Sequence, residues 1–268
     1  MTGEDVPDDA ALRDWLAGRP VLIAYGLLGD VSARLRPLGF DYMGAQQDWL
    51  RRMGARPQVV RVPTAAAVAE NAALLGTALA GVGPPPALLI AHSKGGLEGL
   101  AALLEPATAA RCAGFIAFQS PFRGTPLADW VARRDTMHSL SRAALSLLGC
   151  GDGAGLRDLT TTVREAWIAA HAGEIAALAA RLPVVSCATV LDPATARRGG
   201  RDAAYAALVG GLGRVAGPND GLVPLASTRL PGPVRHLESP GGHVALVSAG
   251  GGRDPVAALR RALVALLA

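Results

Sequence analysis

Lysine is almost missing from this sequence. Lysine and arginine together number 26, but Lys94 is the single lysine, and the net charge is only +4 with no long basic run. A protein that binds nucleic acid through its phosphates needs a concentrated positive surface. Although the pI is about 9.4, the charge pattern therefore gives no support to a nucleic acid partner.

Long apolar runs are lacking as well. Hydrophobic residues make up 50% of the chain, but 33 Gly and 19 Pro interrupt them. No run reaches the roughly 18 apolar residues of a membrane-spanning helix. Residues 1–20 are acidic and polar, whereas a secretory signal is basic and then apolar. We expect a cytoplasmic protein with no integral membrane segment.

Cysteine is scarce and unpaired in the sequence. Cys112, Cys150 and Cys187 are widely spaced, without a CxxC pair or a nearby histidine at metal-ligand spacing. An odd number of separated cysteines favours reduced, mostly buried thiols over a metal centre or a disulfide framework.

Short apolar runs alternate with helix-like segments along most of the chain. Such alternation predicts an α/β fold, with a doubly wound, mostly parallel sheet covered by helices on both faces. The length of 268 residues fits a single domain over 1–268. Strands are expected at 20–25, 58–62, 87–91, 114–119, 183–191 and 234–238, and helices at 9–19, 41–53, 64–82, 94–104 and 255–267.

The rhythm changes between about residues 121 and 182. This stretch is rich in leucine and alanine and reads as helices with no strand between them until about residue 181. We expect a helical cap or lid inserted into the domain.

Ser93 is placed where an apolar strand should meet a helix. Ala91 and Gly95 flank it in a small-x-Ser-x-Gly pattern. A tight strand-to-helix turn of this kind exposes a nucleophilic Oγ at the carboxyl edge of the sheet, and the N–H of the next residue, Lys94, can face an oxyanion. We expect the Lys94 side chain to point outward, either simply solvated or with a role of its own. A serine that only caps a helix is the alternative.

Two of the five histidines fit the role of a base. In doubly wound hydrolases the triad runs in the order Ser, acid, His, which leaves His236 and His243 and excludes His92, His138 and His171. His236 lies inside the expected strand 234–238, whereas His243 follows it in a glycine-rich loop. Catalytic groups favour loops at strand ends, so His243 is preferred.

Asp220 is the preferred acid, because a carboxylate in the turn-rich loop 217–224 can reach an imidazole Nδ1. Asp192 competes, although its Asp-Pro context suits a plain turn. Leu27, at the exit of the first strand, is expected to supply the second oxyanion N–H from a glycine-containing turn.

Four motifs, taken in order, resemble the bacterial triacylglycerol lipases of the true-lipase (Pseudomonas and Burkholderia) type within the α/β-hydrolase superfamily. They are Tyr25-Gly-Leu-Leu-Gly-Asp30, Ala91-His-Ser-Lys-Gly-Gly96, the lid-proximal Ser120-Pro-Phe-Arg-Gly-Thr-Pro-Leu-Ala-Asp129, and Asn219-Asp-Gly-Leu-Val223. The resemblance implies triad roles for Ser93, Asp220 and His243, oxyanion N–H groups from Leu27 and Lys94, and a mobile lid near 125–160.

The sequence also departs from that family. Tyr25 replaces the histidine of the oxyanion turn, and Ala245 replaces a calcium-binding aspartate that follows the catalytic histidine. Ala226 stands where the family has a disulfide partner, which leaves Cys187 without an obvious mate. Ala245 predicts that there is no structural calcium, and the missing disulfide partner, together with the lack of a secretory signal, predicts an intracellular relative. We expect no other metal and no cofactor.

These observations together predict a serine-dependent carboxylic ester hydrolase, an esterase or lipase, that forms an acyl-enzyme on a small-molecule ester or a hydrophobic polyester. The same triad would also serve an acyltransferase, a thioesterase, a peptidase or an amidase, and a non-catalytic binding protein of the same fold is a further alternative. The oligomeric state is open. Candidate substrate-pocket residues are Tyr25, Leu28, His92, Phe122, Met137 and Leu140.

Overall fold

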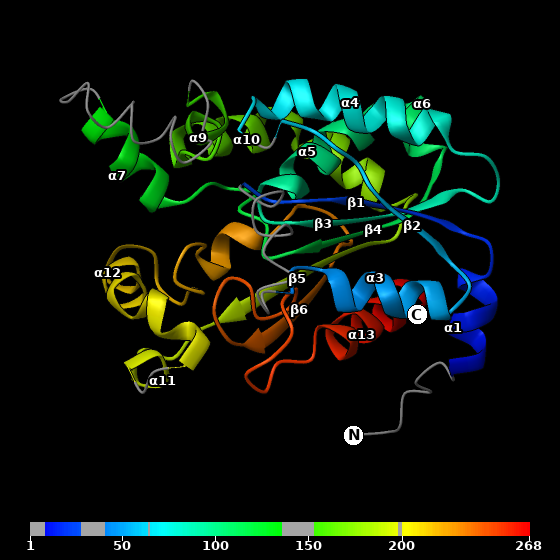
Figure 1. Ribbon diagram of the computed structural model, residues 1–268. Helices are drawn as coiled ribbons and strands as arrows, with labels where there is room; N and C mark the ends of the chain where they lie inside the picture. Colours follow the sequence, from blue (N-terminus) through cyan, green and yellow to red (C-terminus); the bar gives the residue numbers. More distant parts are fainter. Residues whose placement is uncertain (1–8, 28–40, 64, 136–152, 198–199) are drawn as a thin grey trace.

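The fold is a central sheet covered by helices on both faces (Figure 1). The computed structural model describes residues 9–27, 41–63, 65–135, 153–197 and 200–268. Helices α4, α5 and α10 lie on one face of the sheet, and α1, α3 and α13 lie on the other. The predicted doubly wound arrangement is therefore confirmed.

Six strands form the sheet in the order β2-β1-β3-β4-β5-β6, and all five strand pairs are parallel. From β1 the chain moves to one edge for β2 and then returns to the other side for β3. Ligand sites in doubly wound sheets lie at the carboxyl ends of the strands beside such a reversal. The strands are β1 (Pro20–Ala24), β2 (Arg56–Val59), β3 (Ala87–His92), β4 (Cys112–Phe118), β5 (Val184–Val190) and β6 (Arg235–Pro240).

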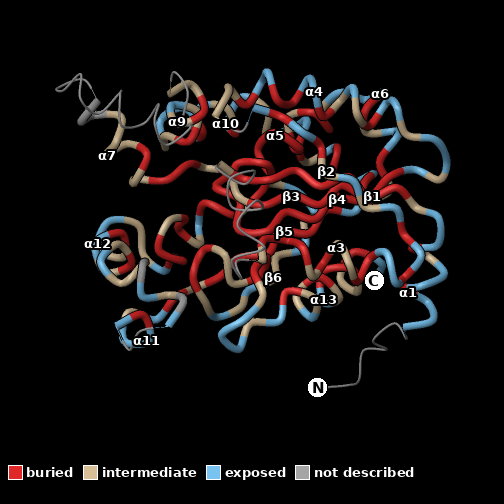
Figure 2. The backbone as a smooth tube through the Cα atoms, in the orientation of Figure 1, coloured by how far each residue is buried: buried red, intermediate tan, exposed pale blue. Residues whose placement is uncertain are grey.

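The inner strands are buried on both faces, which explains why they read as unbroken apolar runs. In β1, Leu22 and Ala24 belong to the hydrophobic cluster shared with α4 and α5. Val21 and Ile23 belong to the opposite cluster, shared with α1, α3 and α13. Figure 2 shows the central strands as almost continuously buried.

Every helix expected outside the cap region is present; the helix at 255–267 has the expected bounds, and the others are shorter than expected. The helix expected at 64–82 spans residues 68–81, and the one expected at 9–19 ends at residue 16. The strand expected at 58–62 instead occupies 56–59, because it is an edge strand whose register follows β1 and whose residues alternate in exposure. The five helices are α1 (Asp9–Leu16), α3 (Gly44–Arg52), α4 (Val68–Gly81), α5 (Lys94–Leu103) and α13 (Pro255–Leu267).

The remaining helices include those of the expected cap. In the described part of 121–182 there are helices and no strand, as predicted, and α7 lies beyond the carboxyl ends of the strands together with α11 and α12 (Figure 1). No helix of the described ranges is long and apolar enough to cross a membrane. These helices are α6 (Pro106–Ala109), α7 (Pro126–Asp135), α9 (Ala154–Arg157), α10 (Thr161–Ala179), α11 (Pro193–Arg197) and α12 (Ala206–Ala216), with short 3₁₀ turns η2 (Gly200–Tyr205) and η3 (Leu225–Thr228).

Candidate active site

Ser93 occupies a sharp turn between β3 and α5. Its backbone has φ 54° and ψ −126°, a conformation that costs a residue with a side chain roughly 1–3 kcal/mol. The Ser93 N–H donates to the carbonyl of Phe118 in β4 at 2.9 Å, which helps to hold the turn. Strain of this kind is typical of nucleophiles on elbows.

The two glycines after Ser93 are required by close packing. A Cβ on Gly95 would lie 2.6 Å from the carbonyl oxygens of both Ala24 and Tyr25. A Cβ on Gly96 would lie 2.0 Å from Ser120 Oγ. Both distances are far below van der Waals contact, so the start of α5 can approach the ends of β1 and β4 only without side chains at these positions.

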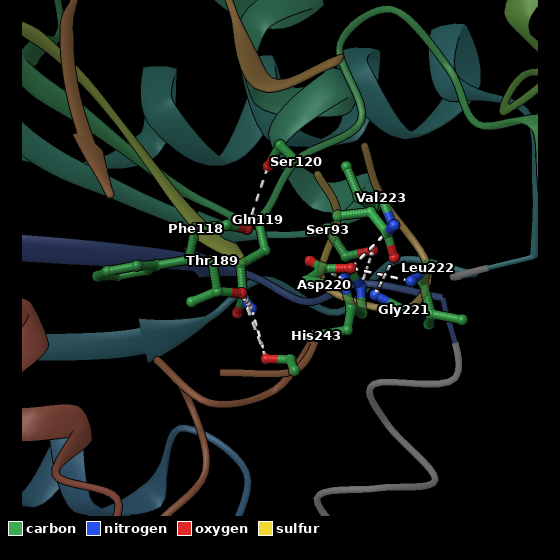
Figure 3. Close-up of polar contacts among 12 residues, drawn as sticks. Ser93, Phe118, Gln119, Ser120, Thr189, Asp220, Gly221, Leu222, Val223 and His243 are labelled. Carbon is green, nitrogen blue, oxygen red and sulfur yellow. Dashed lines mark hydrogen bonds and ion pairs between the residues drawn. The ribbon is translucent and has the colours of Figure 1, made fainter. Parts of the chain in front are cut away.

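Ser93, His243 and Asp220 lie in hydrogen-bonding sequence. His243 Nε2 is 3.0 Å from Ser93 Oγ, and His243 Nδ1 is 2.9 Å from Asp220 Oδ2. Figure 3 shows the three side chains converging from separate loops. Because Asp220 Oδ2 is an acceptor, Nδ1 carries the proton, and Nε2 is left to accept from the serine hydroxyl.

The Asp220 carboxylate is fixed by its own loop. Its second oxygen accepts the N–H groups of Leu222 at 2.9 Å and Val223 at 2.8 Å. Gly221, with φ 98°, makes the tight turn between them possible. These bonds (Figure 3) leave Oδ2 free to face the imidazole.

The two competing residues lie elsewhere. Asp192 accepts the N–H groups of Ala194 and Thr195 and so begins α11 as a plain turn residue. His236 lies in β6, where burial and the charge of Arg229 lower its pKa. Among the described residues, neither side chain is hydrogen-bonded to Ser93, His243 or Asp220.

The exit of β1 lies against the serine. A Cβ on Gly26 would be 2.8 Å from Ser93 Cβ, so Leu27 follows directly beside the elbow. Within the described part of the chain, neither the Leu27 N–H nor the Lys94 N–H makes a hydrogen bond. Both donors are available to a ligand oxygen, at the positive end of α5 in the case of Lys94.

His92 links the exit of β1 to the loop that carries His243, a role that the sequence did not indicate. Its Nδ1 is 2.8 Å from the hydroxyl of Tyr42, which accepts the Gly26 N–H at 3.1 Å. Its Nε2 lies 2.9 Å from the carbonyl oxygen of His243. Burial, and then the nearby His243, lower the pKa of His92 to about 3. His92 is therefore neutral, accepting from Tyr42 and donating to His243.

Gln119 provides a second anchor for the same loop. It follows β4 with a positive φ of 51° and is fully buried. Its Nε2 donates to the Gly242 carbonyl at 2.9 Å and to Thr189 Oγ1 at 2.5 Å (Figure 3). The ends of β3, β4 and β5 thus hold the segment that carries His243.

The prediction that the Lys94 side chain points outward is wrong. It is 0% exposed and forms an ion pair with Glu98. Residues four apart share a helix face, and on α5 this face is covered by α4 and by the segment at Gly155, where an added Cβ would meet Lys94. Asn71 Nδ2 also donates to Glu98, at 2.8 Å, and burial raises the pKa of Glu98.

A cavity of about 610 Å³ opens over Ser93. Its lining includes His92, as predicted for the substrate pocket. Tyr25 and Phe122, which were also predicted to line the pocket, are not part of it. Tyr25 packs against Tyr42, and Phe122 is sealed in the core. Leu28, Met137 and Leu140 lie outside the described residues. The lining residues are Leu27, Tyr42, His92, Ser93, Pro121, Thr125, Leu127, Ala128, Val131, Leu156, Leu159, Tyr205, Leu222, Val223, His243, Val244 and Arg253.

Cys112 and Cys187 are free and buried, as expected for reduced thiols. Burial raises the pKa of Cys112 to about 11 and that of Cys187 to about 12, so both remain protonated at neutral pH. Cys150 lies outside the described residues. Within those residues, no three His, Cys, Asp or Glu side chains gather as a metal site.

No protein-family model matches the sequence, and no curated protein matches it. Among solved structures, the metagenomic carboxyl esterase MGS0156 superposes with a TM-score of 0.69 at 24% identity, over 94% of this chain and 74% of that one. Lipase BlEst2 of Bacillus licheniformis gives 0.65 at 20% identity, over 91% and 90%. Lipase 1 of Pelosinus fermentans gives 0.59 at 13% identity, over 94% and 98%.

These likenesses and the parallel sheet define the class of fold: the chain has the α/β-hydrolase fold. The narrower resemblance to the Pseudomonas and Burkholderia lipases stays a prediction. The cytoplasmic location and the single domain with its lid stay predictions as well.

Proposed function

We propose that the chain is a serine-dependent carboxylic ester hydrolase. One observation carries the proposal: Ser93 Oγ lies 3.0 Å from His243 Nε2, and His243 Nδ1 lies 2.9 Å from Asp220, at a strained elbow that opens into a cavity. A serine that only caps a helix does not require a histidine and a buried carboxylate in line with its hydroxyl.

In the proposed reaction, His243 takes the proton of Ser93 as Oγ attacks the acyl carbonyl. The N–H groups of Leu27 and Lys94 stabilise the tetrahedral oxyanion, and each such donor is worth about 10²–10³ in rate. Asp220 fixes the tautomer of His243 and stabilises the imidazolium. The imidazolium then protonates the leaving alcohol, and an acyl-enzyme remains until water, deprotonated by His243, releases the acid.

The cavity favours an apolar acyl group. Its wall on the cap side consists of Leu127, Ala128, Val131, Leu156 and Leu159. Carboxyl esterases and lipases also occur among the solved structures of this fold that the chain resembles. Medium-chain esters and hydrophobic polyesters are the substrates that we propose.

Covalent labelling tests the nucleophile separately from the choice of substrate. A fluorophosphonate probe should phosphonylate the purified protein once, at the peptide that contains Ser93, and Ser93→Ala should remove the label. Ser120→Ala is the matched control, since Ser120 is a buried serine beside the elbow, and it should retain labelling. Labelling at another serine would overturn the assignment.

An acyl-chain series then tests the substrate class. With p-nitrophenyl esters from acetate to dodecanoate, kcat/KM should be highest for the medium chains, because they fill the apolar wall of the cavity. A strong preference for acetate or for charged acyl groups would contradict the proposed substrate class.

A further inference from the structure

Nearly all polar side chains that line the cavity already have hydrogen-bond partners within the protein. Tyr42, His92, Ser93 and His243 belong to the hydrogen-bond network described above. Thr125 donates to the carbonyl of Leu222 and accepts from Leu127. Two polar side chains of the lining remain, Tyr205 and Arg253.

Tyr205 lies between the two catalytic loops. An added Cβ on Gly221, the neighbour of Asp220, would meet the Tyr205 side chain at 2.6 Å, and one on Gly242, the neighbour of His243, would meet its ring at 2.7 Å. The Tyr205 ring therefore lines the cavity on the side of His243.

The hydroxyl of Tyr205 can donate a hydrogen bond to a ligand. It has no hydrogen-bond partner among the residues that the structure describes, and it is not among the sealed side-chain atoms, so a ligand can reach it. Burial, followed by the charge of Asp220, raises the pKa of Tyr205 to about 12. The phenol therefore keeps its proton at neutral pH.

Arg253 has further N–H donors, and Asp202 neutralises its charge. One of its Nη atoms pairs with Asp202, which also accepts the Gly242 N–H at 3.2 Å. A guanidinium has five N–H donors, and this ion pair is the one hydrogen-bonded contact of the Arg253 side chain within the described ranges. Because Asp202 neutralises the cation, the site suits an uncharged acceptor better than a carboxylate.

We propose that Tyr205 and Arg253 bind a carbonyl oxygen in the alcohol part of the ester. The leaving oxygen must lie next to His243, which protonates it, so the alcohol part extends along the wall that Tyr205 and Arg253 share. The acyl part extends along the apolar cap wall instead. This inference rests on the proposed function and assigns the substrate class as esters whose alcohol carries a second, uncharged carbonyl.

The test compares two butyrate esters of similar size, the ester of 1-hydroxybutan-2-one and that of butan-1-ol. The keto alcohol is the better leaving group, but this intrinsic difference cancels when the ratio of the two kcat/KM values is compared between enzyme variants. Tyr205→Phe removes one unpartnered oxygen and should lower that ratio about 5-fold, the equivalent of one neutral hydrogen bond.

Two further variants complete the design. Arg253→Lys keeps a cation opposite Asp202 with fewer donors and should also lower the ratio. Tyr25→Phe is the matched control, because the Tyr25 hydroxyl bonds Gln47 and Tyr25 is not part of the cavity wall, and it should leave the ratio unchanged. An unaltered ratio in both Tyr205→Phe and Arg253→Lys would overturn the inference.

An affinity measurement on an inactive variant tests the carbonyl-binding inference independently of ester hydrolysis. In Ser93→Ala, the keto ester should bind more tightly than butyl butyrate by calorimetry, and Tyr205→Phe in that background should remove the preference. If the native protein hydrolyses neither ester, the proposed function fails. The binding preference then still decides the inference, because equal affinities in Ser93→Ala would overturn it.

Discussion

His92 Nε2 lies 2.9 Å from the backbone carbonyl of His243, so the residue before Ser93 in the chain is bonded to the loop that carries His243. Through Tyr42, the same imidazole is connected to Gly26 beside the oxyanion turn. One buried neutral side chain therefore positions both His243 and the strand exit that precedes Leu27. In the proposed reaction His92 is therefore a positioning residue rather than a reacting group.

Replacing His92 by leucine should lower kcat by about 10–100-fold while KM changes little, because small displacements of catalytic groups are costly in rate. Steady-state kinetics on p-nitrophenyl butyrate measure both parameters. His171→Leu is the control, since His171 stacks on Trp167 away from the site. A change in KM alone would show that His92 contributes to binding and not to the position of His243.

The low pKa of His92 makes stability depend on pH. The pKa is about 3 in the folded chain against 6.5 as the ordinary value, so below pH 6.5 the unfolded state takes up a proton that the folded state does not. The stabilisation is complete above pH 6.5 and is lost as pH falls toward 3.

Between pH 7 and pH 5.5, His92 should account for a loss of about 1 kcal/mol in the free energy of unfolding. Urea titrations at the two pH values measure it, and His92→Leu should reduce the loss by that amount. The difference between the two proteins gives the contribution of His92 together with its coupling to His243. Equal losses in both would show that the imidazole is not held neutral.

The buried pair of Lys94 and Glu98 should show strong energetic coupling. Lys94→Met leaves a buried carboxyl without its partner and should cost about 3–5 kcal/mol, whereas the double variant with Glu98→Leu should recover most of that loss. Urea unfolding of both single variants and the double variant gives the coupling. The exposed pair Arg51–Asp48 is the control, with an expected coupling of about 0–1 kcal/mol. Additive effects at Lys94 and Glu98 would contradict the ion pair.

Gly96→Ala should destabilise the protein by about 1–3 kcal/mol through overpacking, because the new Cβ would lie 2.0 Å from Ser120 Oγ. Adding Ser120→Gly makes room and should restore part of the stability. Gly173→Ala in α10 is the control, since its Cβ would meet nothing within 4 Å, and it should stabilise by roughly 0.5–1 kcal/mol. Thermal and urea unfolding measure all four proteins. Equal effects of Gly96→Ala and Gly173→Ala would argue against the close approach at the elbow.

The sequence predicted those parts of the fold and site that depend on local pattern. Apolar runs bounded by Gly or Pro located the strands, and the small-x-Ser-x-Gly context placed Ser93 on the elbow. Asp220 and His243 were selected by chain order and loop position, and the structure brings both to Ser93.

The rest depends on contacts between distant parts of the chain. Tyr42 reaches His92 across 50 residues, and Gln119 reaches Gly242 across 123, and no local pattern marks either. The burial of Lys94 had one visible signal, Glu98 four residues later. Whether that helix face is covered is decided by α4 and the segment at Gly155, not by α5 itself.

The most direct test of the central claim is the release of p-nitrophenol from butyrate and octanoate esters by the native protein and by Ser93→Ala, side by side. We predict turnover by the native protein and a fall to background in the variant, because no other group described near His243 can replace the serine oxygen. Equal rates in the two proteins would contradict the assignment of Ser93 as nucleophile. Inactivity of the native protein on both esters would contradict the proposed ester hydrolysis.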